Sequence, residues 1–585
     1  MKKLYKILPA LLLALSLASC DDFLDVKPQG ILDQETAYSE PEKVLNAAYA
    51  MLGNDWFEWP FNLWPYGDMT SDDCMMGGGG LGDTQYHSIE VFTVNAAHGH
   101  LDALWYRLFF AISRCNRALD AIESATNLDP VRQEQMRAEA LFLRAHFYYK
   151  LISVFYQVPW IGMEDAKNNM HETISNTEFT HEQLMLKVID DFKYGYNHLP
   201  AKAPGWTLAH KDAAAAYVAK CYLDIAYGDG YEATNYPNVE INKAYLDSVI
   251  VYTKDIIDGS TYDLLEDYGD VFLPEFRNSK ESIFAVQHSL NNIDNTNVGR
   301  ANWSNTLNGV WGIWSKGWDF HKPTQNLVNA FRLDNNGAPL DPSLGDYNEI
   351  LRQGEITTYK YDPRLFHTVG MPTYPYKYEP EWTLTWKNSR TPSDFGFYCS
   401  MKEVTQRSKG DVWVEDTWQA FAQNDYVIRY AEVLLMAAEA YIESGKDINE
   451  GVALINKLRT RANASVTKHI GYAAAQVGSL NTYSGLSKDE ARKALRNERR
   501  VELAMEGRRF FDLRRWGMCS TTLNNFFKEK PVYTYEDDEM EEQNQAYAEY
   551  YQREAFFNSG KNEYWPVPSN QMLYVPGLYE QNKGY

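Results

Sequence analysis

The sequence predicts a mainly α protein with a few short strands, and three observations support this fold class. Apolar residues recur at i, i+3, i+4 and i+7 in several long segments, which is the period of an amphipathic helix. Most of these segments end at a Gly or a Pro, the residues that commonly follow a helix. The segments come in pairs with small residues at the expected crossings, as in tetratricopeptide-like helix pairs. No clean period of about 34 residues is present, so we expect irregular pairs.

The helical pattern can be followed along the chain. It predicts helices at 42–52, 101–123, 134–155, 181–199, 213–227, 243–258, 426–443, 449–462 and 488–516. The pattern at 282–288 predicts a short strand.

Two stretches lack a sustained helical period. Residues 53–100 contain three Trp within nine positions and four consecutive Gly, and residues 263–423 contain four Trp within 16 positions. Long irregular stretches in a compact domain are often functional. We therefore divide the chain into the tether and N-terminal segment 20–40, a helical region 41–262 with the loop insertion 53–100, a loop-rich region 263–423 and a C-terminal helical region 424–585. The length of 585 residues allows one large domain or two to four ordinary ones.

The N-terminus has the features of an export signal. Lys2, Lys3 and Lys6 precede an apolar run that ends at Leu17 and is shorter than a membrane-spanning helix. Small residues then precede Cys20, as in the lipobox of bacterial lipoproteins. We expect 1–19 to be a lipoprotein signal peptide and Cys20 to carry acyl chains, which would anchor the protein on a membrane. An ordinary secretory signal is the alternative.

Composition narrows the possible partners and the redox chemistry. The formal charge is -23, and removing residues 1–19 takes three lysines and no acids, which gives -26. Such an acidic body argues against a nucleic-acid partner. Five cysteines remain besides Cys20, with no CxxC spacing, so neither a zinc ribbon nor a redox pair is expected. Cys115 and Cys221 are expected to be buried thiols within helices.

Five segments carry a resemblance to a known family. They are "FLDVKPQG" (23–30), "RAEALFLRAHFYYKLISVFYQVPW" (137–160), "DYVIRYAEVLLMAAEAY" (425–441), "NERRVELAMEGRRFFDLRRWG" (497–517) and "WPVPSN" (565–570). In this order, spanning nearly the whole mature chain, they resemble the SusD/RagB family.

The resemblance implies a SusD-like single domain with four tetratricopeptide-like helix pairs and ligand-binding loops. It implies a non-catalytic surface lipoprotein that captures glycans and sits over a TonB-dependent outer-membrane transporter of the SusC type. Asp21 and Asp22, directly after Cys20, are similar to the acidic signal that sends lipoproteins of the Bacteroidetes to the cell exterior. The implied location is the outer membrane, lipid-anchored and facing outward.

The glycan site is placed from physical chemistry, because the family site is not a sequence motif. A sugar offers an apolar C–H face, which Trp and Tyr rings cover, and hydroxyls, which Asp and Asn side chains bond. Both irregular stretches supply these residues. The first offers the candidates Trp56, Trp59, Trp64, Asp68, Asp72 and Asp73, and the second offers Trp303, Trp311, Trp314 and Trp318 with Asn302 and Asn305.

Other motifs are weaker. The Gly run at 77–80 lacks GK[ST], His98 and His100 lack a third ligand and are expected to face solvent, and Asp334 begins no complete calcium loop. No metal or cofactor is therefore expected. Glu498, Glu502 and Glu506 lie one helical turn apart among arginines, which is typical of ion-paired packing.

Two other functions stay open at this point. A surface glycoside hydrolase needs two carboxylates without any local motif. A binding protein for peptides or other nutrients, or a helical scaffold for protein partners, would need no sugar site.

Overall fold

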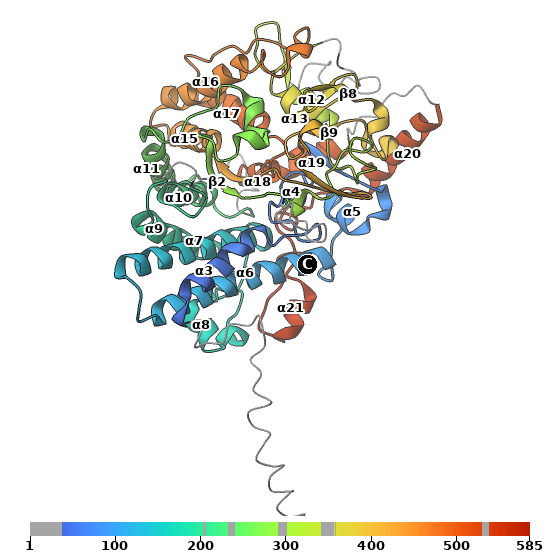
Figure 1. Ribbon diagram of the computed structural model, residues 1–585. Helices are drawn as coiled ribbons and strands as arrows, with labels where there is room; N and C mark the ends of the chain where they lie inside the picture. Colours follow the sequence, from blue (N-terminus) through green and yellow to red (C-terminus); the bar gives the residue numbers. More distant parts are fainter. Residues whose placement is uncertain are drawn as a thin grey trace, which may run out of the picture.

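The computed structural model describes residues 38–202, 206–231, 240–290, 301–340, 356, 359–528 and 538–585 (Figure 1). The predicted signal peptide, Cys20 and the segment 23–30 lie outside the described residues. Within the described part, no helix combines the length and the apolar character needed to cross a bilayer.

Paired helices form one flank of the molecule, from the blue N-terminal helices to the orange C-terminal ones (Figure 1). Contacts link α6 to α7, α7 to α9, α9 to α10, α10 to α11, α11 to α15 and α15 to α16. These helices, with α3 and α17 beside them, are α3 (Pro41–Tyr49), α6 (Gly99–Ser124), α7 (Pro130–Phe155), α9 (His181–His198), α10 (Lys211–Ile225), α11 (Lys243–Asp258), α15 (Tyr430–Ser444), α16 (Ile448–Ala464) and α17 (Lys488–Glu502).

Local chemistry explains where these helices begin. The Asp129 carboxylate accepts hydrogen bonds from the N–H groups of Val131 and Arg132, and so caps α7. Thr180 and Ser487 open α9 and α17 with reciprocal capping boxes. The small residues of α10 are fully buried, which lets neighbouring helices approach closely. The predicted mainly α, SusD-like class with irregular helix pairs is confirmed.

The predicted helix 426–443 is wrong at its start. Residues Asp425–Arg429 form β12, which pairs antiparallel with β2 (Ser282–Val286), and α15 begins only at Tyr430. The apolar spacing of this segment is that of a helix. Its first residues form a strand instead, because their backbone pairs with β2, which lies far away in the sequence. The predicted strand at 282–288 is confirmed by β2.

The predicted helix 488–516 is divided in two. It ends as α17 at Glu502 and resumes as α18 (Arg509–Arg515). Between them, Met505 and Gly507 have φ angles of 60° and 74°, outside the helical region. The Gly507 N–H donates to Asp68 Oδ2 at 2.7 Å, so the break serves a contact with the first irregular stretch.

The two irregular stretches are built from short elements. The remaining strands of the described residues pair antiparallel as β1 (Cys74–Gly77) with β3 (Phe320–Pro323), β4 (Arg332–Leu333) with β5 (Lys360–Tyr361), β6 (Val369–Gly370) with β9 (Cys399–Ser400), β7 (Pro375–Tyr376) with β8 (Glu379–Thr383), and β10 (Val412–Glu415) with β11 (Trp418–Phe421). The short or peripheral helices are α4 (Trp64–Gly67), α5 (Thr84–Glu90), α8 (Met163–Lys167), α12 (Gln325–Ala330), α13 (Leu365–Thr368), α14 (Pro392–Phe395), α19 (Cys519–Lys528), α20 (Asp538–Glu554) and α21 (Ser569–Tyr574).

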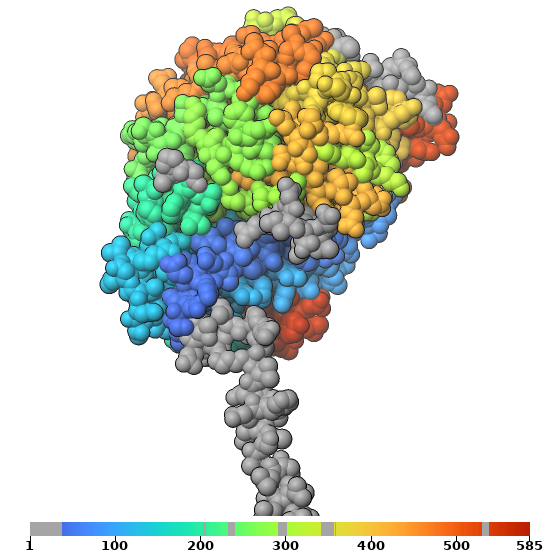
Figure 2. All heavy atoms as spheres, in the orientation of Figure 1, coloured from blue at the N-terminus to red at the C-terminus, as the bar shows by residue number. Residues whose placement is uncertain are grey.

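The loop-rich region lies above the N-terminal helices. Figure 2 shows yellow and orange surface from this region over much of one upper flank. The cysteines Cys74, Cys115, Cys221, Cys399 and Cys519 are buried, unpaired thiols, and Cys115 and Cys221 lie within α6 and α10 as expected.

Candidate functional site

The two irregular stretches meet at their tryptophans. The ring centroids of Trp56 and Trp303 are 4.6 Å apart. The backbone beside them is fixed, because the Asn302 N–H donates to the Phe421 carbonyl at 2.7 Å and Asn62 Nδ2 donates to Asn305 Oδ1 at 2.7 Å. Residues far apart in the sequence therefore form one aromatic surface.

The hairpin of β10 and β11, which the Trp density of the sequence does not single out, extends this surface. Trp413 of β10 lies 5.3 Å from Trp303, and Trp418 of β11 lies 6.2 Å from Trp56 and 5.5 Å from Trp318, between ring centroids. Two short segments rich in Val, Trp and Phe, 412–414 and 418–421, flank the polar residues 415–417, and this is the sequence signal that could have found it. We call the five rings Trp56, Trp303, Trp318, Trp413 and Trp418 the indole cluster.

Each ring of the indole cluster is half-buried, so each keeps part of its surface open to solvent. Three further candidates are also half-buried. The Arg107 guanidinium carbon lies 4.4 Å from the Trp59 ring centroid, and Trp314 Nε1 donates to the Tyr376 hydroxyl at 3.4 Å. Trp311 accepts a hydrogen bond at its carbonyl from Asn388 Nδ2 at 3.1 Å, which ties it to the segment carrying Trp386 and Arg390.

Trp64 does not belong to this surface, which corrects the prediction. Its side chain is only 2% exposed, and its Nε1 donates to the Ser304 carbonyl at 3.0 Å. The ring packs on His321 with centroids 4.9 Å apart. Trp64 therefore fills space beneath the loops and offers no face to a sugar.

The prediction that Asp72 and Asp73 bind sugar hydroxyls is also wrong, because both carboxylates are paired with arginines. Arg509 Nε donates to Asp72 Oδ1 at 2.8 Å, and Arg500 Nε donates to Asp73 Oδ1 at 2.7 Å. Burial alone would raise the pKa of Asp72, but Arg500 and Arg509 hold that pKa well below its usual range. Both buried carboxylates are engaged in ion pairs that hold the first stretch to the C-terminal helices.

Asp68 belongs to a buried charged triad rather than to a sugar site. His321 lies between two carboxylates, with Nε2 3.0 Å from Asp68 Oδ2 and Nδ1 2.5 Å from Glu403 Oε1. Burial disfavours the charged imidazole, but Glu403 and Asp68 outweigh it and raise the pKa of His321 to about 9. The protonated ring thus joins both irregular stretches.

The asparagine candidates are buried. Asn302 is 1% exposed, and its side-chain amide has no partner among the described residues. Asn305 is buried and accepts from Asn62. The predicted role of Asn302 in contacting a ligand at the surface is not supported by this burial.

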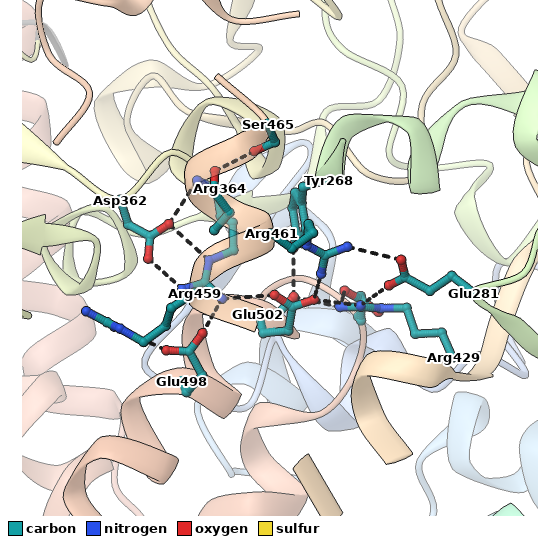
Figure 3. Close-up of polar contacts among 12 residues, drawn as sticks. Tyr268, Glu281, Asp362, Arg364, Arg429, Arg459, Arg461, Ser465, Glu498 and Glu502 are labelled. Atoms are coloured by element: carbon teal, nitrogen blue, oxygen red, sulfur yellow. Dashed lines mark hydrogen bonds and ion pairs between the residues drawn. The ribbon is translucent and has the colours of Figure 1, made fainter. Parts of the chain in front are cut away.

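Glu498 and Glu502 of α17 are buried and form part of an ion-pair network (Figure 3). Glu502 accepts from Arg364 at 2.9 Å, from Arg429 at 2.7 Å and from Arg461 at 2.5 Å. Burial opposes ionisation, yet these arginines hold the pKa of Glu502 well below its usual range. Glu498 also pairs with Arg364, at 2.5 Å. The expected ion-paired packing is confirmed, although these partners come from distant segments.

The polar clusters that could suggest a metal are engaged in contacts within the protein. His98 is 7% exposed, and its Nδ1 accepts a hydrogen bond from the Leu101 N–H as the cap of α6. The expectation that His98 faces solvent is therefore wrong. Asp267, Asp270 and His469 bring possible ligand atoms within 4.8 Å of one another. Lys468 Nζ lies 2.7 Å and 2.5 Å from the two Asp270 oxygens, so an ammonium group already neutralises that carboxylate.

Known proteins are similar to this chain in sequence and in fold. Residues 280–585 match the family described as "SusD family", and residues 22–223 match "Starch-binding associating with outer membrane". The chain is 25% identical over 525 residues to the SusD-like protein P2 of Formosa agariphila, covering 88% of this chain and 91% of that protein.

Solved structures agree in fold. A SusD-like protein of Bacteroides fragilis has a TM-score of 0.68 at 19% identity, covering 95% of this chain and 99% of the other. A protein described as a laminarin binding SusD-like protein has a TM-score of 0.64 at 20% identity, covering 93% and 99%. The family match covers more than half of the sequence and the fold match nearly all of it. The chain therefore belongs to the SusD/RagB family.

Proposed function

We propose that this protein binds glycans at the cell surface through the indole cluster. The observation that carries the proposal is the contact of Trp56 with Trp303, which joins the two irregular stretches in one aromatic surface. These half-buried residues pack against their neighbours and keep part of their surface accessible, and an accessible indole face is what the C–H face of a sugar needs.

The character of the family supports a binding role. SusD-like proteins are non-catalytic, and one structural neighbour is described as a surface glycan-binding protein of Bacteroides fluxus. The carboxylates that sequence spacing could have assigned to hydrolysis, Glu498 and Glu502, are fully buried against arginines, where no substrate reaches them. Binding by stacking and hydrogen bonds is the chemistry that remains for the exposed rings.

The second part of the proposal concerns location and delivery. A family description that places such proteins at the outer membrane supports an outward-facing position there. We propose that Cys20 carries the lipid anchor, and that the protein passes captured oligo- or polysaccharide to a TonB-dependent transporter. Anchoring beside a transporter would raise the local concentration of captured sugar. A Cys20→Ala variant that still sediments with outer membranes would contradict the anchor.

Affinity electrophoresis tests the glycan site. Native gels containing one polysaccharide each, neutral and acidic, should retard the wild-type protein on at least one gel. Trp303→Ala and Trp413→Ala should reduce this retardation while the melting temperature shows that the fold persists. Tyr574→Ala is the matched control, because this 79% exposed ring lies on α21, away from the loops (Figure 1).

The outcomes separate the alternatives. No retardation on any gel, together with binding of peptides, would replace the glycan assignment with the peptide one. Shortened oligosaccharides after incubation with the pure protein would reveal a hydrolase. Retardation unchanged in both Trp variants would move the site away from the indole cluster.

A further inference from the structure

Two neighbouring segments beside the indole cluster combine indoles with positive charge. Residues 311–318 read WGIWSKGW and residues 386–390 read WKNSR, and neither contains an acid. The Asn388 side chain bonds the Trp311 carbonyl, and the Arg390 N–H donates to Asp319 Oδ2 at 2.8 Å. In a chain of 79 acidic and 56 basic residues, this is a local excess of positive charge. Its cations are Lys316, Lys387 and Arg390.

The Arg390 guanidinium is held by rings rather than by acids. Its central carbon lies 4.6 Å from the ring centroid of Trp318 and 6.0 Å from that of Trp311. Such cation–π contacts favour a fixed position for the group. Among the described residues, Arg390 Nη1 is buried and has no hydrogen-bond acceptor. The residue as a whole is half-buried, so the accessible part of its guanidinium, which has five donors and no acceptor, can donate to a ligand.

Two carboxylates close to the Arg390 segment are already engaged. Asp83 Oδ2 accepts from the Gly79 N–H at 2.7 Å, and Asp319 Oδ2 accepts from Lys322 Nζ at 2.7 Å. A Cβ atom added at Gly79 would lie 2.9 Å from Asp83 Oδ2 and 3.3 Å from Arg390 Nη2. Because Gly79 has no side chain, the side chains of Asp83 and Arg390 can both occupy the space beside it.

We propose that this surface, the Arg390 face, selects acidic glycans by binding the carboxylate of a uronic acid or the sulfate ester of a sulfated sugar. The planar guanidinium presents parallel N–H groups that match two oxygens of either anion. The half-buried Trp311, whose ring centroid lies 6.0 Å from the guanidinium carbon, supplies apolar surface for the sugar ring that carries the anion. The inference rests on the proposed glycan-binding function and adds the charge class of the ligand.

The dependence of affinity on salt concentration can reveal this selectivity for acidic glycans. The formal charge of -23 repels a polyanion at long range, so only a local cation can offset that repulsion. Attraction that depends on a partly exposed guanidinium is screened within about 8 Å at physiological salt. Affinity for the acidic ligand should therefore fall as salt rises, and affinity for a neutral ligand should not.

The experiment uses ligand pairs that differ only in charge. Isothermal titration calorimetry of the full protein would use polygalacturonate and its carboxyl-reduced form, and a sulfated galactan free of uronic acid and its desulfated form. We expect the wild-type protein to bind an acidic member at least about 10-fold more tightly than its neutral partner. Arg390→Gln should weaken binding of that acidic member about 10- to 100-fold, as expected when a hydrogen-bonded charge pair is lost.

Two further variants define the role of Arg390. Arg390→Lys keeps the charge and loses the paired donors, so its affinity should fall between those of the wild-type protein and Arg390→Gln. Arg137→Gln removes the same charge from the exposed surface of α7 and should leave binding unchanged. Thermal melting of each variant confirms that it is folded.

The outcomes distinguish this inference from the proposed function. Neutral and acidic members bound equally, with Arg390→Gln unaffected, would overturn the acidic-glycan assignment and leave glycan binding intact. Acidic members bound with undiminished affinity by Arg390→Gln would also overturn the Arg390 face. If the wild-type protein bound none of these ligands and no polysaccharide in the affinity gels, the proposed function itself would fail.

Discussion

Trp56 and Trp303 lie with ring centroids 4.6 Å apart, although one follows the first helix and the other lies near the middle of the chain. We expect this contact to couple the two irregular stretches energetically. In a double-mutant cycle of Trp56→Ala and Trp303→Ala, chemical denaturation should give a coupling energy of about 0.5–1.5 kcal/mol. Additive effects of the two substitutions would show that the stretches are held together elsewhere.

His321 should make stability depend on pH above neutrality. Its pKa of about 9 in the folded protein exceeds the ordinary value of 6.5, so folding favours the protonated ring. This contribution, at most about 3 kcal/mol, is complete below pH 6.5 and is lost as pH rises through 9. The free-energy difference between the wild-type protein and His321→Gln should therefore shrink between pH 6.5 and 9.

Urea denaturation at several pH values measures this difference. His171→Gln, at a half-exposed imidazole, is the control and should show no such trend. A difference that stays constant up to pH 10 would contradict a protonated His321.

Glu502→Gln should destabilise the protein by about 3–5 kcal/mol, because it removes the carboxylate shared by Arg364, Arg429 and Arg461 and leaves buried positive charge uncompensated (Figure 3). Denaturation at pH 7 measures the loss. The same substitution at Glu542, an exposed residue of α20, should change stability by less than about 0.5 kcal/mol. A loss at Glu502 no larger than at Glu542 would show that the network contributes little.

Gly67→Ala should destabilise the junction between the first irregular stretch and the turn after α17. A Cβ atom at Gly67 would lie 2.1 Å from the Gly507 carbonyl oxygen, so the backbone must move. We expect a loss of about 1–3 kcal/mol, the usual range for overpacking. Gly471→Ala, where an added Cβ meets nothing within 4 Å, is the control, and equal melting temperatures for both variants would contradict this close approach.

Most helices could be predicted because their causes are local. The apolar period lies within 134–155 and 181–199, and the caps Asp129 and Thr180 lie only a few residues before these segments, so α7 and α9 end within one residue of the prediction and begin within four. The predictions were wrong where a distant partner acts. Residues 426–429 form a strand because β2 pairs with them, and the helix at 488–516 breaks where Gly507 meets Asp68.

The candidate site could be predicted by region and not by residue. Trp density located both irregular stretches, and Trp56, Trp303 and Trp318 lie in the indole cluster. The same density could not separate Trp64, which is buried on His321, from Trp56, which is half-exposed. Trp413 and Arg390 were missed because nothing in their own segments shows which rings lie beside them.

The sequence by itself determined the helical framework and the family, because periodicity, capping and long ordered motifs are properties of neighbouring residues. It also determined that indoles concentrate in two irregular stretches. Only the tertiary structure decided which indoles keep an open face and which carboxylates are neutralised, as Asp72 is by Arg509. Burial and ion pairing arise between residues hundreds of positions apart, so their outcome depends on how the loops fold onto the helices.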